Sequence, residues 1–458
     1  MPRRMDAGRL REELRRYLSR AGPAEGRSAY RELGVSQPAF SRLAGSMRDE
    51  LLVVGRGRST RYAARRSILD VGRSVPVHEV AEDGRSRCLA VLHAVLPRGY
   101  FVEARSKDVE SGFHDDLPWF LDDLRPAGFL GRLVPRRHPE LRLPEDIRLW
   151  PGDQCVNYLS RLGWSSVGSL VVGDLAIRLH VEYGLNPRDV VPKDRAGELY
   201  PSMADDVMAC GPPGSSAGGE QPKFLAARGP ERTSVLVKFS PPVHEGEIGR
   251  RLADLLVCEH VAHQVLGEHG QPSCRSTLIE AGGRVFLEIE RFDRIGASGR
   301  RGIVSLQALD AAFAGRLGSW TETASVLADR SVLGQPDLDR IRWLEWFGRF
   351  IGNSDMHGAN LSFFLRGARV LGLAPAYDML PMAYAPQHGQ LLDRWTPPPH
   401  PAPPDAAAWR EARIGATQFW SRVAARSDLS PAFRTIAREN EGRLQSLARI
   451  ERLLPGGP

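Results

Sequence analysis

A polar segment between apolar stretches constrains this chain more than any other feature of its sequence. It covers residues 352–360 and reads Gly-Asn-Ser-Asp-Met-His-Gly-Ala-Asn, and an apolar run follows it at 362–365. A second acidic residue, Asp378, comes directly after the next apolar stretch. A loop of this kind is often a plain turn, but two acidic positions that each adjoin an apolar strand favour a site that carries chemistry.

The spacing within this segment fits the transfer of a phosphoryl group. That reaction needs a carboxylate to orient the attacking hydroxyl, two magnesium ligands, a lysine for the phosphates and a phosphate cradle. Asp355 and Asn360, in the order Asp-x-x-x-x-Asn, supply a carboxylate and an amide, and a hairpin brings Asp378 back beside them. Because this chemistry uses a carboxylate as base, Asp355 fits that role better than His357, which we expect to shape the loop or contact nucleotide.

Two upstream segments supply the remaining parts. The glycine- and serine-rich segment 211–223 has small residues whose backbone N–H groups can approach phosphate oxygens, although alone it is as readily a surface turn. The apolar strand-like run 234–239 contains Lys238 near its end, and the predicted helix 247–266 carries Glu259. Protein kinases pair a strand lysine with a helix glutamate, so we expect Lys238 to contact Glu259. The simpler alternative is an ordinary edge-strand lysine and a solvated helix glutamate.

Five strings in the chain resemble the HipA family of toxin-type serine/threonine kinases. They are Ser-Ser-Ala-Gly-Gly-Glu-Gln-Pro-Lys at 215–223, Leu-Val-Lys-Phe at 236–239, Glu-Arg-Phe-Asp-Arg at 290–294, the segment 352–360, and Tyr-Asp at 377–378. The match extends over roughly residues 80–440. It implies an α+β fold: a two-lobed protein-kinase architecture with a mostly helical C-terminal lobe, dependent on ATP and Mg²⁺.

The resemblance also implies roles for individual residues. Asp355 is the implied proton acceptor, Asn360 and Asp378 are the implied magnesium ligands, and Lys238 is implied to contact the phosphates. Residues 290–292 are implied to form the hinge beside adenine. The full set implied to bind ATP is Ser216, Ala217, Gly218, Gly219, Lys223, Lys238, Glu290, Arg291, Phe292, His357, Asn360, Tyr377 and Asp378.

Members of the resembled family phosphorylate a serine in the glycine-rich loop, which ejects the loop and switches the enzyme off. Ser215 or Ser216 matches this position. The loop is one residue longer than the usual family pattern, so the resemblance leaves open which serine corresponds and whether the switch is kept. Equally, both hydroxyls can simply cap loop amides.

The first 70 residues differ from the rest of the chain in charge and pattern. They hold 16 arginines against eight acidic residues, a net charge of +8, while the remainder carries −1. Helical spacing at 8–20, a short helix at 28–33 and a third helix from Ser36 to residue 46 form a helix-turn-helix pattern. Two short strands, 51–54 and 60–63, flank a Gly-Arg-Gly-Arg turn, so we predict a winged helix over residues 1–70.

We expect this winged helix to bind DNA, with a protein-docking surface as the alternative. The residues expected in the major groove are Ser36, Gln37, Ser41 and Arg42, and those expected on backbone phosphates are Arg56, Arg58 and Arg61. HipA proteins usually leave DNA binding to a separate antitoxin. This departure implies a subfamily with both functions on one chain, and it leaves open whether an antitoxin partner exists.

The remaining sequence sets boundaries and excludes some classes. We expect a second unit at 71–200, a nucleotide-binding lobe at 201–295 and a helical lobe at 296–458, with the proline cluster 396–404 as a connector. Bilayer-length apolar runs and the apolar core of a secretory signal are both missing, so we expect a cytoplasmic protein that contacts no membrane. The five cysteines never form a C-x-x-C pair, and His260 and His263 lack a third ligand, so no zinc site is predicted.

Together these features predict an ATP- and magnesium-dependent serine/threonine kinase with a DNA-binding domain. Its expected acceptor is a protein, and the resembled family sometimes targets translation factors. The alternative is a DNA-binding regulator whose kinase-like part senses nucleotide without transfer, against which the intact set of Lys238, Asp355, Asn360 and Asp378 argues. A small-molecule kinase is a third interpretation, because the same loop serves any acceptor.

Overall fold

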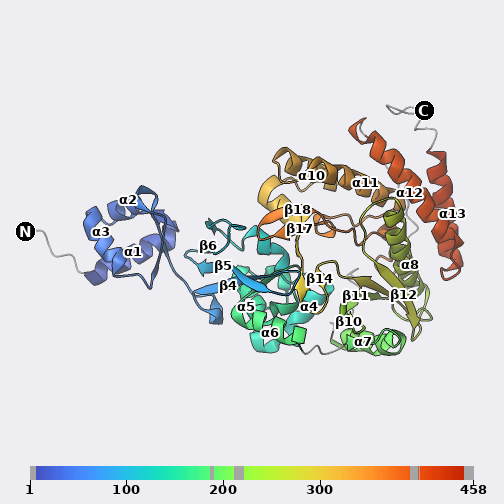
Figure 1. The fold of residues 1–458 in the computed structure, drawn as a ribbon, viewed down its shortest axis with the longest axis horizontal. Coiled ribbons are helices and arrows are strands. Elements are labelled where there is room, and N and C mark those ends of the chain that lie inside the picture. The colour runs from blue at the N-terminus through green and yellow to red at the C-terminus, as the bar shows by residue number, and fades with distance from the viewer. Residues whose placement is uncertain (1–6, 186–189, 211–220, 392–400, 402, 448–458) are drawn as a thin grey trace, which may run out of the picture.

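The computed structural model describes residues 7–185, 190–210, 221–391, 401 and 403–447. Figure 1 shows an elongated molecule, with the first three helices at one end and the last two helices at the other. The two lobes that carry the predicted site lie toward the C-terminal end, and a second unit lies between them and the N-terminal helices. None of the helices formed by the described residues is long and apolar enough to cross a bilayer.

The N-terminal unit consists of three helices and a small antiparallel sheet. Its elements are α1 (Ala7–Ala21), β1 (Ala24–Glu25), α2 (Gly26–Glu32), α3 (Gln37–Gly45), β2 (Leu51–Val54) and β3 (Arg61–Ala64), with β3 in the middle of the sheet. The helices and strands expected from the sequence are confirmed to within a few residues. Ser36 caps α3 by accepting the Ala39 N–H at 3.4 Å, and Leu14 and Leu18 of α1 are fully buried in one cluster with Phe40 of α3.

The N-terminal unit is packed against the second unit rather than joined to it by a free linker. Leu52 and Ala63 of its sheet form one buried apolar cluster with Val95 and Phe101 of the second unit. Arg66 follows β3, and its Nε donates to Val95 O at 3.0 Å. The two units therefore share a small core as well as hydrogen bonds.

The second unit is an antiparallel sheet backed by helices. Its strand order is β7-β6-β5-β4-β8, made of β4 (Ser74–Val80), β5 (Ser86–Ala94), β6 (Tyr100–Ala104), β7 (Gly112–His114) and β8 (Leu170–Val172). Its helices are the 3-10 helix η3 (Trp119–Leu124), α4 (Gly128–Arg137), α5 (Gly152–Leu162) and α6 (Asp174–Leu185). The strands expected near 88–96 and 100–104 and the helical pieces expected near 117–124 and 153–162 are confirmed.

The next unit is a five-stranded sheet with a helix on each face. The strand order is β12-β13-β11-β10-β9, made of β9 (Val190–Val191), β10 (Lys223–Arg228), β11 (Thr233–Phe239), β12 (Ser276–Ala281) and β13 (Arg284–Glu290). Helix α7 (Ala196–Cys210) packs on the face that carries Val235 and Val237. Helix α8 (Glu247–Glu268) packs on the opposite face, against Leu287 and Ile289.

The last unit is mostly helical. Its helices are α9 (Leu306–Leu309), the π-helical turn η8 (Asp310–Ala314), α10 (Trp320–Asp329), α11 (Gln335–Ile351), α12 (Ala406–Ala425) and α13 (Pro431–Ser446). A small sheet, β16 (Gly302–Ser305), β17 (Ser362–Arg366) and β18 (Arg369–Leu373), adjoins them, and the short hairpin β14 (Arg294–Ile295) and β15 (Gly299–Arg300) precedes it. Buried aromatic residues such as Phe347, Trp409 and Trp420 join α11 to α12. The chain as a whole therefore mixes α and β structure.

Candidate active site

Lys238 lies at the centre of a buried charge cluster. Its Nζ donates to both carboxylate oxygens of Glu259, at 2.7 and 2.8 Å, and to Asp378 Oδ1 at 2.5 Å. Lys238 is 5% exposed and Glu259 is fully buried, whereas the side chain of Asp378 keeps 30% of its surface. The expected contact between Lys238 and Glu259 is therefore present, and one cation serves two carboxylates.

The alternation of β11 explains where Lys238 points. Val235, Val237 and Phe239 belong to the apolar cluster on the α7 side of the sheet. Since successive side chains of a strand point to opposite faces, Lys238 is directed toward α8. A buried ammonium group needs a counter-charge, and Glu259, on the α8 face that meets the sheet, supplies it.

Burial and charge act in opposite directions on these groups. Burial alone would raise the pKa of the Asp378 carboxyl, but the ammonium groups of Lys238 and Lys223 outweigh it and lower that pKa to about 2. Burial also disfavours the Lys238 ammonium, yet Asp378 and Glu259 hold the pKa of Lys238 above its usual range. Burial raises the pKa of Glu259, against the pull of Lys238. At neutral pH the contact between Lys238 and Asp378 is an ion pair.

The loop 352–360 begins where α11 ends. Gly352 ends the helix in a left-handed conformation, with φ of 76°, and Asn353 N donates to Gly348 O at 2.8 Å. Asn353 is buried and joins two segments, because its Oδ1 accepts the Asp355 N–H at 3.0 Å while its Nδ2 donates to Asp378 O at 3.3 Å. Asn353 thus sets the two acidic residues relative to each other, a role that sequence reasoning missed.

Asn360 and His357 complete the loop. Asn360 Nδ2 donates to Asp355 O at 2.8 Å, a bond that uses the amide nitrogen of Asn360 and not its oxygen. The side chains of Asp355 and His357 are 50% and 53% exposed. His357 Nε2 lies 3.7 Å from Asp355 Oδ1. The carboxylate expected to act as base is therefore open to an approaching molecule.

Tyr377 is hydrogen-bonded to the loop 352–360 and holds it in place. Its hydroxyl donates to Ala359 O at 2.8 Å and lies 2.6 Å from Ser362 Oγ, and its ring lies 6.0 Å from that of Phe292. We expected Tyr377 to contact ATP, but its hydroxyl is engaged by the protein itself. Any contact with a nucleotide would be left to its ring and to Phe292.

The Glu-Arg-Phe-Asp-Arg string has a buried carboxylate at its centre. Asp293 is 4% exposed and accepts from Arg291 at 2.8 Å, from Arg294 at 2.7 Å and from the Gly168 N–H at 2.9 Å. Burial would raise the pKa of Asp293, but the two guanidinium groups hold it well below its usual range. The string therefore ties the end of β13 to the second unit, and the guanidinium of Arg291, an expected ATP contact, is held by Asp293. Glu290 is exposed at the strand end.

Part of the expected phosphate cradle lies outside the described residues. The predicted positions concerned are Ser215, Ser216, Ala217, Gly218 and Gly219. At the described end of the cradle, Lys223 opens β10 opposite Lys238 of β11. Both lysines lower the pKa of Asp378, so two cations adjoin the site where phosphates are expected.

In the N-terminal unit, the side chains expected in a DNA groove lie on the surface of α3 and at its cap. The exposed residues are Ser36, Gln37, Ser41, Arg42 and, between β2 and β3, Arg56. The side chain of Arg58 lies outside the described part. Arg61 is exposed as well, and its guanidinium donates to Pro23 O at 3.0 Å and lies 5.0 Å from the centre of the Phe113 ring in the second unit.

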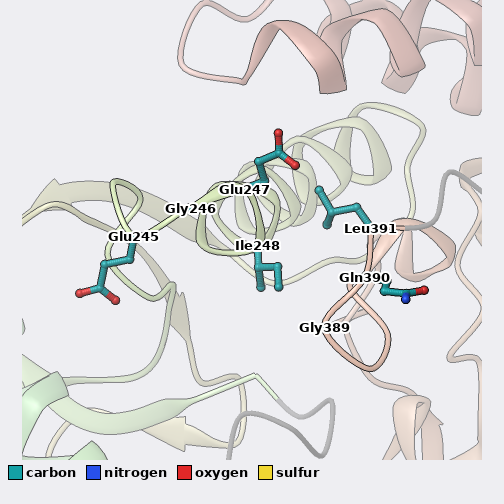
Figure 2. A pocket seen from close by; sticks show the side chains of 7 residues that line it. All are labelled: Glu245, Gly246, Glu247, Ile248, Gly389, Gln390 and Leu391. Atoms are coloured by element: carbon teal, nitrogen blue, oxygen red, sulfur yellow. The ribbon is translucent and has the colours of Figure 1, made fainter.

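Two hollows adjoin α8 at its opposite ends. One, of about 580 Å³, lies at its N-terminus, where Figure 2 shows Glu247 and Ile248 on one side and Gln390 and Leu391 on the other. The second, of about 660 Å³, is bordered by His260 and His263.

The two histidines have packing roles. Their Nδ1 atoms lie 2.9 Å (His260) and 3.0 Å (His263) from the same Ser276 hydroxyl, and burial lowers the pKa of His263 to about 3. Within the described residues no group of three His, Cys, Asp or Glu side chains lies together in a way that could hold a metal ion.

Known proteins share both the middle and the C-terminal part of this sequence. Residues 215–441 match the HipA-like C-terminal domain, and residues 71–181 match the family described as YjjJ-like toxin, middle domain. Toxin YjjJ of Escherichia coli (strain K12) is 36% identical over 431 residues, which are 93% of this chain and 96% of that protein. The chain belongs to the HipA family of toxins.

One solved structure agrees with this assignment at the level of the fold. HipA of Shewanella oneidensis MR-1, solved with HipB and its operator DNA, matches with a TM-score of 0.51 at 16% identity, over 82% of this chain and 97% of that one. The Helicobacter pylori proinflammatory kinase CtkA matches 49% of this chain and 90% of that one at 11% identity, with a TM-score of 0.36, which is too low to bear on the fold. This HipA-family toxin therefore has the mixed α and β fold of a HipA protein.

Proposed function

We propose that this HipA-family toxin is an ATP- and magnesium-dependent serine/threonine protein kinase that works in the cytoplasm and binds DNA through its N-terminal unit. The contact of Lys238 with Glu259 and Asp378 carries the proposal. Protein kinases use a strand lysine, oriented by a helix glutamate, to hold the ATP phosphates, and an aspartate from a later segment to bind magnesium. A nearly buried lysine shared by two carboxylates is hard to explain by stability alone, because such charge clusters add little stability over apolar packing.

The donor atoms near Asp355 fit a magnesium ion bound together with nucleotide. Carboxylate and amide oxygens are the ligands that hard divalent cations prefer. Asp378 stays ionised at neutral pH because of its low pKa, and the amide oxygen of Asn360 remains after its nitrogen has bonded to Asp355 O. When bound, magnesium neutralises charge on the phosphates during transfer.

The remaining residues divide the work of positioning and proton transfer. Asp355 accepts the proton of the attacking hydroxyl, and its half-exposed carboxylate is accessible to the side chain of a protein acceptor. Lys238 holds the phosphates, with Glu259 keeping its ammonium group in place. Lys223, opposite Lys238 on the neighbouring strand, adds a second cation.

The N-terminal unit supports the DNA-binding part of the proposal. Its three helices and antiparallel strands follow the order of a winged helix, and α3 presents the polar surface that a recognition helix needs. The net charge of +8 over residues 1–70 favours a polyanion over a protein partner. HipA of Shewanella oneidensis was solved with HipB and operator DNA, whereas this chain would contact DNA through its own N-terminal unit, with or without an antitoxin.

Mass spectrometry of the purified full chain incubated with ATP and magnesium tests the kinase. We expect the wild type, and the control Asp329→Ala at an exposed position of α10, to transfer phosphate to itself or to proteins of a cell lysate. Asp355→Ala and Asp378→Ala should transfer none. Tight ATP binding without transfer by the wild type would instead favour a DNA-binding regulator that senses nucleotide.

A further inference from the structure

Asp123, a carboxylate of the second unit, bonds to Ser305 of the helical lobe. Ser305 lies next to the end of the loop 352–360, which is the catalytic loop of the proposed kinase. Asp123, in η3, accepts two hydrogen bonds from Ser305, one from the backbone N–H at 2.5 Å and one from the hydroxyl at 2.6 Å. The Ser305 hydroxyl in turn accepts the Ala308 N–H at 3.1 Å and caps α9. Asp123 therefore holds the residue at which β16 ends and α9 begins.

From Ser305 the contact continues to the end of the catalytic loop. Ser305 is paired with Ser362 in the antiparallel ladder of β16 and β17. The next residue, Leu306, donates its N–H to Leu361 O at 2.8 Å. Leu361 directly follows Asn360, so the backbone next to this expected magnesium ligand is bonded to the residue that follows Ser305, the residue that Asp123 holds.

A second branch returns to the loop through a side chain. Ser362 Oγ lies 2.6 Å from the Tyr377 hydroxyl, which donates to Ala359 O at 2.8 Å. The start of α9 also touches the loop, since a Cβ on Gly358 would lie 3.0 Å from Gln307 N. Residues 358–361 are thus contacted both by the start of α9 and by Tyr377. Both contacts are linked to Ser305, one directly along the chain and the other through Ser362.

We propose that Asp123 is a positioning residue for the catalytic loop, acting through Ser305, Ser362 and Tyr377. The proposal rests on the kinase function proposed above. It means that the second unit helps to set the geometry of the active site. Asp123 contacts no reacting atom. A carboxylate suits the position because its two oxygens accept from an N–H and an O–H at once, whereas an asparagine would present an N–H to one of them.

The simpler alternative is that Asp123 only fastens the second unit to the helical lobe. Other contacts already do that: Trp119 of η3 packs against Phe313 with ring centres 5.1 Å apart, and Phe120 and Leu121 are buried in the shared core. Loss of the Asp123 carboxylate should therefore leave the two parts packed. What it should change is the geometry of the loop.

Steady-state phosphoryl transfer by the full chain tests this role, with kcat and the KM for ATP measured per folded molecule. We expect Asp123→Ala to lower kcat about 10- to 100-fold, the effect of a displacement of roughly 1 Å at a catalytic group, with the KM for ATP unchanged within about twofold. Asp123→Asn should recover part of the loss, because one oxygen can still accept the Ser305 N–H. The matched control is Asp122→Ala, since Asp122 is in the same helix and bonds to Arg125 at 2.7 Å.

A double substitution sharpens the test. If Asp123 acts through Tyr377, Asp123→Ala combined with Tyr377→Phe should cost less than the product of the two single effects on kcat. Independent effects, or a kcat per folded molecule that Asp123→Ala leaves unchanged, would overturn the positioning role alone. A wild type that transfers no phosphate would refute the kinase function, and the positioning role with it.

Discussion

The charge cluster at Lys238 predicts an order of stabilities among three variants. Lys238→Met leaves Glu259 and Asp378 without their shared cation, one of them fully buried, and breaking a buried pair in this way costs about 3–5 kcal/mol. Glu259→Gln is milder, because Lys238 keeps Asp378 at 2.5 Å and the amide oxygen still accepts. Its expected cost is about 1–2 kcal/mol, that of one weakened charged hydrogen bond.

The double variant Lys238→Met/Glu259→Gln should be more stable than Lys238→Met alone. It removes the charges of Lys238 and Glu259, the two more deeply buried groups, and leaves only Asp378, which keeps 30% of its side-chain surface exposed. An apolar or neutral replacement of a whole buried pair is often nearly neutral, so we expect a recovery of about 1–3 kcal/mol relative to Lys238→Met. The coupling between the two sites is then large and of opposite sign to either single cost.

Urea unfolding followed by tryptophan fluorescence measures these differences. The chain has nine tryptophans, and those buried in the helical lobe include Trp343, Trp346, Trp409 and Trp420, so the signal reports on the part that carries Asp378. Lys107→Met, at an exposed site, is the control and should change stability by less than about 0.5 kcal/mol. Equal costs for the two single variants, or a double variant whose cost is their sum, would refute the reasoning.

Three further outcomes follow from the contacts. Asp378 has a folded pKa of about 2, below its unfolded value, so the stabilisation it provides is present at neutral pH and is lost as the pH falls below about 4. Roughly 1 kcal/mol of the free energy of unfolding should be lost by pH 3. Urea unfolding at pH 7 and pH 3 measures this loss, and Asp378→Asn should lack this part of it. Ser36→Ala should destabilise the N-terminal unit by about 1 kcal/mol in calorimetry, with Ser36→Asp restoring the cap. Asp293→Asn leaves Arg291 and Arg294 without a counter-charge and should cost about 3–5 kcal/mol in thermal unfolding monitored by circular dichroism.

The sequence predicted the parts of the site that depend on short-range pattern. Lys238 could be placed because a single lysine within an apolar strand is a local signal. Asp355 and Asn360 could be placed because their spacing lies within one loop. Asn353 was missed because its two bonds join segments 25 residues apart, although an asparagine directly after a helix-ending glycine is a signal that could have drawn attention to it. Asp293 was missed because its value to the fold depends on Gly168, which is 125 residues away in sequence.

The structure adds side-chain partners that the sequence does not indicate. Tyr377 and Arg61 lie in the segments where they were expected, but the hydroxyl of one and the guanidinium of the other are engaged within the protein. Composition and local pattern cannot reveal such partners, because they come from tertiary packing of distant elements. The same reasoning explains why the sequence pattern of the second unit does not indicate a role for Asp123, whose partner Ser305 is 182 residues away.

The packing of the units has a consequence for how the two proposed activities combine. The N-terminal unit shares an apolar cluster with the second unit at Leu52 and Phe101. The second unit in turn bonds through Asp123 to Ser305, which is paired with Ser362 just after the catalytic loop. A chain bound to DNA through α3 would therefore hold its active site at a fixed place relative to that DNA instead of swinging on a linker. Only acceptors that can approach a DNA-bound chain from the Asp355 side would then be phosphorylated there. Rigid packing alone does not make DNA regulate catalysis, because coupling requires an element with two arrangements.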